Sequence, residues 1–180
     1  MKKKILTLCL AAIMCVSFAA CGSNETNKTE SSVEVPKETN DSKYYFKDGV
    51  MQAEDVKIEI TDYKIIQPGE KGNEYSQKPV IAFWYNTTNL SDHEFNSSVW
   101  LDFFTAIQDN DPNIINELQV GSLPDERFLY TQTESIKPGG TVPSAIAYEL
   151  DDTTTPVTLK AIKGYDGIEL GEQIFNLTSE

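Results

Sequence analysis

The sequence predicts an all-β domain, a sandwich or barrel of seven or eight strands with room for one short helix. From Tyr44 onward, short apolar runs alternate with clusters of Gly, Pro, Asn and Asp about every ten residues, a spacing typical of strands and tight turns. No long stretch there has the apolar period of about 3.6 residues that marks a helix. The 180 residues are 39% hydrophobic and 10% aromatic, an ordinary composition for one folded domain, which we place at residues 44–180.

The first predicted strand starts at Val56 and contains a change of phase. Apolar and polar residues alternate over 56–60, whereas Tyr63 and Ile65 continue the alternation one position out of step. Such a change predicts a β-bulge near Thr61 and Asp62.

The segment from Lys78 to Thr88 is apolar on both faces and is predicted to be a central strand. We place three of its residues inward and three outward, the inward set being Ile81, Phe83 and Tyr85 and the outward set Val80, Ala82 and Trp84. The outward set needs a cover. We expect residues 96–104 to open with a helical turn capped by Ser97 or Ser98 and packed over that outer face, before a strand that runs to Gln108.

The remaining strands are predicted from turn residues and alternation. An Asp/Asn/Pro turn at 109–113 leads into a partner strand at 114–120, and Pro138–Gly140 makes a tight turn. One face of the next strand is lined by Val142, Ser144, Ile146, Tyr148 and Leu150. A turn at 151–156 precedes an inward-facing set of Val157, Leu159 and Ala161, and Ile174–Leu177 forms a last short strand.

Residues 1–20 are predicted to be a secretory leader, with three lysines followed by an apolar run that is short for a membrane span. Residues 18–22, Phe-Ala-Ala-Cys-Gly, resemble the lipobox of bacterial lipoproteins, which implies acylation of Cys21 and a lipid anchor on the extracytoplasmic face of the membrane. Phe18 departs from the usual Leu. The alternative is an ordinary secretory signal in which Cys21 is incidental.

Residues 21–43 are predicted to be the acylated cysteine and a disordered linker, because the segment is polar and has few side chains to bury. The formal net charge of the chain is −13. Nucleic acid is therefore excluded as a partner, since polyphosphate binding depends on Lys and Arg.

Several short motifs resemble a known family. They are the strand exit at Tyr85–Asp92, the run Ala106–Asp109, and Ile136–Val142 with the hairpin that follows it. Together with the lipobox and the polar linker, they are similar to the immunoglobulin-like domain of unknown function (DUF 5067 type) in lipoproteins of Gram-positive bacteria. The resemblance covers roughly residues 44–161. It implies an immunoglobulin-like sandwich of two antiparallel sheets, no established activity and no catalytic residues.

The sequence contains no coherent catalytic set. The single histidine, His93, lies among Ser91, Asp92 and Glu94, and immediate neighbours cannot form the relay of a catalytic triad, so we interpret it as a solvated loop residue. With one histidine and one cysteine beyond the leader, a typical zinc ligand set is absent.

The acidic turns are candidates for calcium binding, with Asp109, Asp111, Asp151 and Asp152 as the ligands. The spacing at 109–113 matches the start of an EF-hand loop. Ile114, however, stands where that loop requires Gly, and Val120 where it requires Glu, so an EF-hand is excluded. The alternative is that these residues only form turns.

The aromatic residues suggest a binding function. We expect most of them in the core, but Trp84 or Trp100 would be a contact for a partner if it stayed exposed. The preferred interpretation is a non-catalytic binding module for a protein or cell-envelope ligand. The alternative is a cell-envelope hydrolase that uses carboxylates, with Asp102 as the one acid inside an apolar run. A transporter's two-lobed binding protein would need a longer chain.

Overall fold

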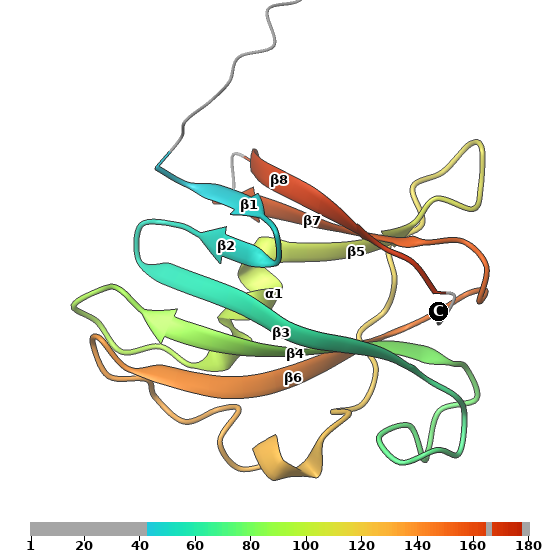
Figure 1. Ribbon diagram of the computed structural model, residues 1–180, viewed down its shortest axis with the longest axis horizontal. Coiled ribbons are helices and arrows are strands. Elements are labelled where there is room, and N and C mark those ends of the chain that lie inside the picture. The colour runs from blue at the N-terminus through green and yellow to red at the C-terminus, as the bar shows by residue number, and fades with distance from the viewer. Residues whose placement is uncertain (1–42, 165–166, 178–180) are drawn as a thin grey trace, which may run out of the picture. The chain divides into compact units, whose positions relative to one another are not determined.

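A computed structural model describes residues 43–164 and 167–177, which form a β-sandwich (Figure 1). The larger sheet has five strands in the order β1-β2-β3-β4-β6, and the smaller sheet has three in the order β5-β7-β8. All paired strands are antiparallel. The strands are β1 Tyr45–Lys47, β2 Val50–Gln52, β3 Val56–Ile66, β4 Val80–Asn89, β5 Phe104–Gln108, β6 Thr141–Glu149, β7 Val157–Lys163 and β8 Ile168–Phe175. The predicted all-β fold and the number of strands are confirmed.

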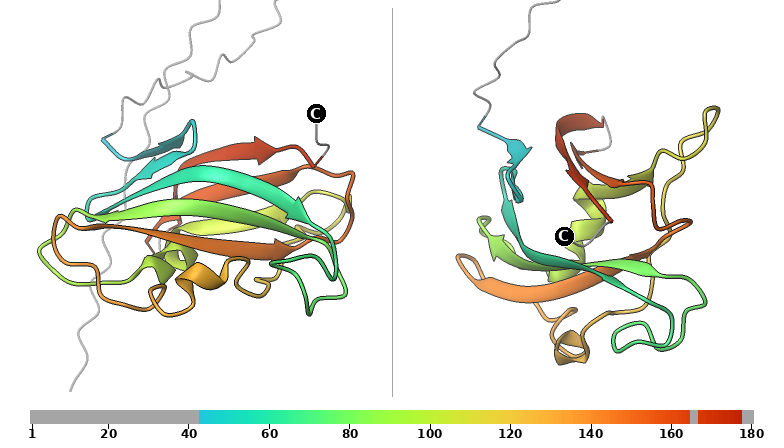
Figure 2. Two further views of the ribbon diagram at one scale, coloured as in Figure 1. Left: turned by 60° about the horizontal axis from the view of Figure 1, so that its bottom comes forward. Right: turned by 45° about the vertical axis from the view of Figure 1, so that its right-hand side comes forward.

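The strand order agrees with the immunoglobulin-like prediction. In the larger sheet β4 lies between β3 and β6, and in the smaller sheet β7 lies between β5 and β8. These are the A-B-E and C-F-G neighbours of an immunoglobulin domain, and the chain first crosses from the larger to the smaller sheet between β4 and β5, as it does between strands B and C of that domain. The hairpin β1–β2 adds two short strands beyond β3, and the two sheets face each other as layers (Figure 2).

The predicted bulge in β3 is confirmed. Ile60 pairs with Tyr85, and the next pair along the ladder is Asp62 with Trp84, so Thr61 has no partner position on β4. The hydroxyl of Thr61 donates a hydrogen bond of 3.1 Å to the carbonyl oxygen of Trp84. The extra residue returns the apolar side chains that follow to the correct faces of the sheet.

The core between the sheets is built around an aromatic cluster. The ring of Trp100 lies 4.4 Å from that of Tyr85 and 4.3 Å from that of Phe104, measured between centroids, and Phe83 contacts Phe175 of the opposite sheet at 4.9 Å. The inward placement of Val157, Leu159 and Ala161 is confirmed, since all three are buried in this core.

The helical turn forms where it was predicted but lies in a different layer. It consists of the 3₁₀ helix η1 (Ser97–Val99) and α1 (Trp100–Phe103), and its Trp100 packs between the sheets rather than over the outer face of β4. The predicted cap is also wrong: Asn96, not Ser97 or Ser98, caps the turn by accepting a hydrogen bond from the backbone N–H of Ser98 at 3.0 Å. The Ser97 hydroxyl donates instead to the carbonyl oxygen of Gln132.

Two further predictions of strand position need correction, and one hairpin was missed. Residues 114–120 do not form a regular strand; they make isolated bridges from Glu117 to Ile107 and from Val120 to Tyr148. The last strand is longer than predicted and already begins at Ile168. The hairpin β1–β2 was not located from the sequence, because strands of three residues are too short for alternation to identify.

Candidate binding site

The outer face of the larger sheet carries a second, smaller apolar cluster. It contains Ile66, Val80, Ala82 and Ala147, with Trp84 packed against them. The predicted directions of the six alternating residues of β4 are therefore confirmed. The cover is the long connection between β5 and β6, which joins β6 through a hydrogen bond of 2.8 Å from the Gly121 N–H to the Ala147 carbonyl oxygen.

Trp84 lies at the centre of this face and is held by the connection. Its indole Nε1 donates a hydrogen bond of 2.8 Å to Oδ2 of Asp125. Asp125 caps the 3₁₀ helix η2 (Glu126–Phe128) by accepting from the Arg127 N–H at 3.1 Å. The Arg127 guanidinium also binds the carboxylate, with Nε 2.9 Å from Oδ1 and Nη2 2.6 Å from Oδ2. One carboxylate thus fixes both the indole edge and the helix start.

The electrostatics of Asp125 follow from these contacts. The hydrogen bonds from Arg127 lower the pKa of the Asp125 carboxyl well below its usual range, and the hydrogen bond from Trp84 acts in the same direction against the effect of partial burial. Asp125 is therefore ionised near neutral pH, and the charge of Arg127 is largely committed to it.

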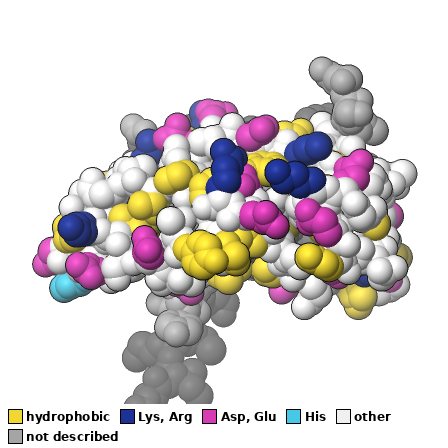
Figure 3. All heavy atoms as spheres, turned by 90° about the horizontal axis from the view of Figure 1, so that it is seen from below, with side chains coloured by type: hydrophobic (Ala, Val, Ile, Leu, Met, Phe, Trp, Pro, Cys, Tyr) yellow, Lys and Arg dark blue, Asp and Glu magenta, His cyan; other side chains and the backbone are white. Residues whose placement is uncertain are grey.

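Beside Trp84 is a hollow of about 370 Å³, which we call the Trp84 hollow. It is lined by Lys64, Ile66, Lys71, Trp84, Pro124, Asp125, Glu126 and Arg127. Within the described part of the chain, the ammonium groups of Lys64 and Lys71 have no ion pair or hydrogen bond. Basic side chains gather beside hydrophobic ones on the face seen from below in Figure 3. An apolar floor with unpaired positive charge suits a ligand that is partly apolar and anionic.

The structure places the two tryptophans differently. Trp84 is partly exposed and lines the hollow, as a partner contact requires. Trp100 is 0% exposed, and its Nε1 donates a hydrogen bond of 2.8 Å to the Tyr148 hydroxyl inside the core. Trp100 therefore does not meet the condition of exposure on which a partner contact was expected, because both its rings and its polar atom are used within the sandwich.

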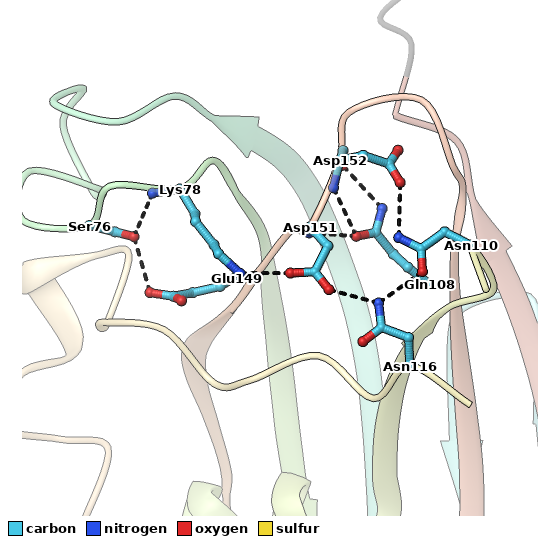
Figure 4. Close-up of polar contacts among 8 residues, drawn as sticks. All are labelled: Ser76, Lys78, Gln108, Asn110, Asn116, Glu149, Asp151 and Asp152. Atoms are coloured by element: carbon cyan, nitrogen blue, oxygen red, sulfur yellow. Dashed lines mark hydrogen bonds and ion pairs between the residues drawn. The ribbon is translucent and has the colours of Figure 1, made fainter. Parts of the chain in front are cut away.

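Two of the candidate calcium ligands belong to a polar network at one end of the sandwich (Figure 4). Asp151 accepts from Lys78 Nζ at 2.6 Å and from Asn116 Nδ2 at 2.9 Å. Asp152 accepts from Asn110 Nδ2 at 3.0 Å and from the backbone N–H of Thr155 at 2.6 Å.

These contacts lower the pKa of both carboxyls. For Asp151 the main cause is the hydrogen bond from Lys78, and for Asp152 it is the backbone N–H of Thr155. The carboxylate oxygens that a cation would need are already hydrogen-bonded, and the network holds neighbouring loops together.

The other two candidate ligands also lie at turns. Oδ1 of Asp111 accepts from the backbone N–H groups of Asn113 and Ile114, and Asp109 is exposed. Among the residues that the structure describes, no group of three or more His, Cys, Asp or Glu side chains could hold a metal ion. The four aspartates are thus not brought together as one ligand set.

The candidate catalytic groups are placed as follows. The imidazole of His93 is exposed and pairs with Asp92 at 3.0 Å, while the Ser91 hydroxyl lies within hydrogen-bond distance of two acceptors, Asn89 Oδ1 at 2.8 Å and the His93 carbonyl oxygen at 2.9 Å. Asp102, the acid of the hydrolase alternative, is exposed on α1. In the described ranges, the pKa of Asp125, Asp151 and Asp152 is lowered, whereas a carboxyl group that acts as a general acid needs a raised pKa. The absence of enzymatic function stays a prediction.

The predicted leader, Cys21 and linker lie outside the described residues. In the described ranges no helix is long and apolar enough to cross a membrane.

The cationic side chains of the Trp84 hollow were not identified from the sequence. The position of Lys64 could have been predicted from alternation. Asp62 pairs with Trp84, and Lys64 lies two residues after Asp62, so its side chain is on the same outer face as Trp84. Lys71 and Arg127 lie in connections, and no periodicity predicts where such residues reach the sheet.

Comparisons with known proteins identify the family and add little on function. The profile of a family described as a domain of unknown function, DUF5067, matches residues 31–163. No curated protein matches the chain. A solved structure from Clostridium difficile 630, described as an uncharacterized β-sandwich protein, is similar at 19% identity and a TM-score of 0.43, covering 67% of this chain and 85% of that one.

Proposed function

The chain belongs to the DUF5067 family, whose function is unknown, and we propose that it is a membrane-anchored extracytoplasmic lipoprotein that binds a partner without catalysis. The binding surface in this proposal is the Trp84 hollow. The observation that carries it is the position of Trp84, partly exposed in a hollow that also contains two lysines with no ionic partner among the residues that the structure describes. Tryptophan is enriched among residues that dominate the binding energy of protein interfaces.

The rigidity of the hollow supports this function. The hydrogen bond to Asp125 holds the indole edge, and the Arg127 contacts hold Asp125. A side chain that is already fixed loses little conformational entropy on binding. The hollow therefore offers a pre-organised aromatic surface rather than a mobile one.

The proposed anchor rests on the sequence. Residues 18–22 resemble a lipobox, and the polar composition of residues 22–43 suits a tether. Two acyl chains, at about 0.8 kcal/mol per buried methylene, hold a protein stably on a membrane. Tethering raises the effective concentration of a binding domain near partners on the same surface.

Site-specific crosslinking tests the binding function. A photoreactive amino acid replaces Lys71 at the rim of the hollow, and in a control chain it replaces the exposed Lys47 on β1. On living cells we expect a defined crosslinked product from position 71 that is absent from position 47. The binding function is wrong if position 71 yields no product, or the same products as position 47.

Metabolic labelling with a fatty-acid analogue tests the anchor. We expect the wild-type chain and a Cys15→Ser control to incorporate the label and a Cys21→Ser chain to incorporate none. Label retained in the Cys21→Ser chain would contradict acylation at that residue. This result leaves the crosslinking experiment unaffected, so the two parts of the proposal are tested separately.

A further inference from the structure

A loop at the far end of β5 exposes two adjacent large apolar side chains. Residues 109–116, which we call the finger loop, project away from the sheets in Figure 1 and in the right-hand view of Figure 2. Ile114 is 64% exposed and Ile115 is 75% exposed. The two adjacent side chains form a small apolar patch at the tip of the loop, and exposed apolar patches are where partners bind.

The finger loop is held in shape by polar contacts within itself and to its base. Asp111 accepts from the backbone N–H of Ile114 at 3.2 Å. Asn116 Nδ2 lies 3.1 Å from Oδ1 of Asn110 and 2.9 Å from Oδ2 of Asp151, which closes the base of the loop (Figure 4). Because the loop is ordered before binding, docking its tip costs little conformational entropy.

The finger loop itself carries acidic and no basic side chains, and the nearby Lys78 at its base is paired with Asp151. Residues 79–126 contain no Lys or Arg, whereas Asp109 and Asp111 lie within the loop and Glu117 directly follows it. The tip is therefore apolar and its base is acidic. A surface complementary to it would have an apolar floor and basic side chains at its rim.

The Trp84 hollow of the same chain has this character. Its floor includes Ile66, Trp84 and Pro124. Its lining has three cationic and two anionic side chains, so the hollow is locally positive although the formal net charge of the chain is −13. Lys64 and Lys71 are the cations without an ionic partner among the described residues.

We propose that the finger loop of one copy of this chain docks into the Trp84 hollow of a second copy. The inference rests on the proposed function, which makes the hollow a binding surface, and names the partner. The contact is head-to-tail, because the loop and the hollow are different surfaces, so each added copy presents a further loop or hollow and the assembly grows into a ring or a short filament.

The net negative charge of each copy opposes this contact at long range. Screening in salt of about 0.15 M confines charge effects to within about 8 Å, so the local pairing of acids at the finger base with Lys64 and Lys71 acts after the two surfaces meet. The association is therefore expected to be weak in dilute solution and to depend on protein concentration.

The test uses the full chain in detergent and two variants, each of which lacks one of the two surfaces. The finger variant is Ile114→Ser with Ile115→Ser, and the hollow variant is Lys64→Glu with Lys71→Glu. All four residues are exposed, so both variants should keep the circular dichroism spectrum and Tm of the wild type. Size-exclusion chromatography with light scattering gives the mass of each chain alone and of the equimolar mixture.

We expect the wild type to form larger species as its concentration rises and each variant alone to remain monomeric. The equimolar mixture should form a dimer and nothing larger, because it contains one intact loop and one intact hollow per pair. A mixture that stays monomeric, a wild type that stays monomeric, or a finger variant that associates like the wild type overturns the inference. If crosslinking at position 71 then captures a different molecule, the proposed function stands and the self-association does not.

Discussion

The indole Nε1 of Trp84 and Oδ2 of Asp125 lie 2.8 Å apart and 41 positions apart in the chain. This hydrogen bond joins the outer face of β4 to the start of η2. Since Asp125 also binds the Arg127 guanidinium at 2.6 Å, one carboxylate orders the tryptophan, the loop and one wall of the hollow. The geometry of the hollow thus depends on a residue that does not belong to the sheet.

Replacing Asp125 with Asn should lower stability and loosen the hollow. The substitution removes a charged acceptor shared by Trp84 and Arg127, and losing hydrogen bonds to a charged group costs about 1.5 to 3 kcal/mol. Urea unfolding followed by circular dichroism measures the cost. Arg127→Gln is the matched control, because it keeps the Trp84 hydrogen bond and should cost less; equal costs would contradict a role for the indole contact.

The same contact should make stability depend on acid pH. The pKa of Asp125 is lowered in the folded chain from an ordinary value of 3.8, so its contribution is complete above that value and disappears as the pH falls toward the folded pKa. In Asp125→Asn this contribution should be missing, and the difference in free energy of unfolding from the wild type should shrink below pH 3.8. A difference that stays constant with pH would show that the charge of Asp125 does not contribute.

Two buried tyrosines predict a late ionisation step at alkaline pH. Burial raises the pKa of Tyr85 and of Tyr148 to about 12, from an ordinary value of 10.0. Stability linked to these groups is complete below pH 10 and is lost as the pH rises from 10 toward 12, because the unfolded chain releases the protons earlier. Tyrosinate absorbance should show a late step that loses amplitude in Tyr85→Phe and in Tyr148→Phe. Full amplitude in both variants would contradict the assignment.

Gly171 should not tolerate a side chain. It lies in β8 at a φ of +142°, and an added Cβ would lie 2.3 Å from the carbonyl oxygen of Phe46 in β1. Gly171→Ala should therefore cost about 1 to 3 kcal/mol more than Gly164→Ala, a control that also has positive φ but, among the described residues other than its chain neighbours, no atom within 4 Å of the added Cβ. Thermal unfolding compares the two. Equal losses would mean that β1 moves aside without cost.

Gln108 should be essential for the turn after β6. It is 0% exposed, accepts from the Asp151 N–H at 2.7 Å and donates to the Thr155 carbonyl oxygen at 2.9 Å. Gln108→Leu keeps the approximate volume but leaves these partly buried backbone groups without their partner, and an unsatisfied group costs about 1 to 3 kcal/mol when fully buried and less here. Gln119→Leu, at an exposed position, is the control in urea unfolding. Equal stability of the two variants would rule out this role.

The sequence by itself determined the class of fold, the bulge in β3 and the direction of the β4 side chains. These features follow from alternation, which depends on the backbone of one strand and on which of its faces is buried. It therefore predicted that Trp84 faces outward and needs a cover. It did not predict which segment supplies the cover, because alternation contains no information about loops.

Only the tertiary structure decided which tryptophan is available to a partner. Both Trp84 and Trp100 were candidate partner contacts in the sequence. Trp100 is buried because the turn that carries it fits between the sheets, where the Tyr148 hydroxyl accepts a hydrogen bond from its indole N–H. The hollow is also a tertiary feature, since Lys64, Lys71 and Arg127 come from a strand and two connections. Burial and charge pairing between distant segments depend on packing, which no local pattern of residues encodes.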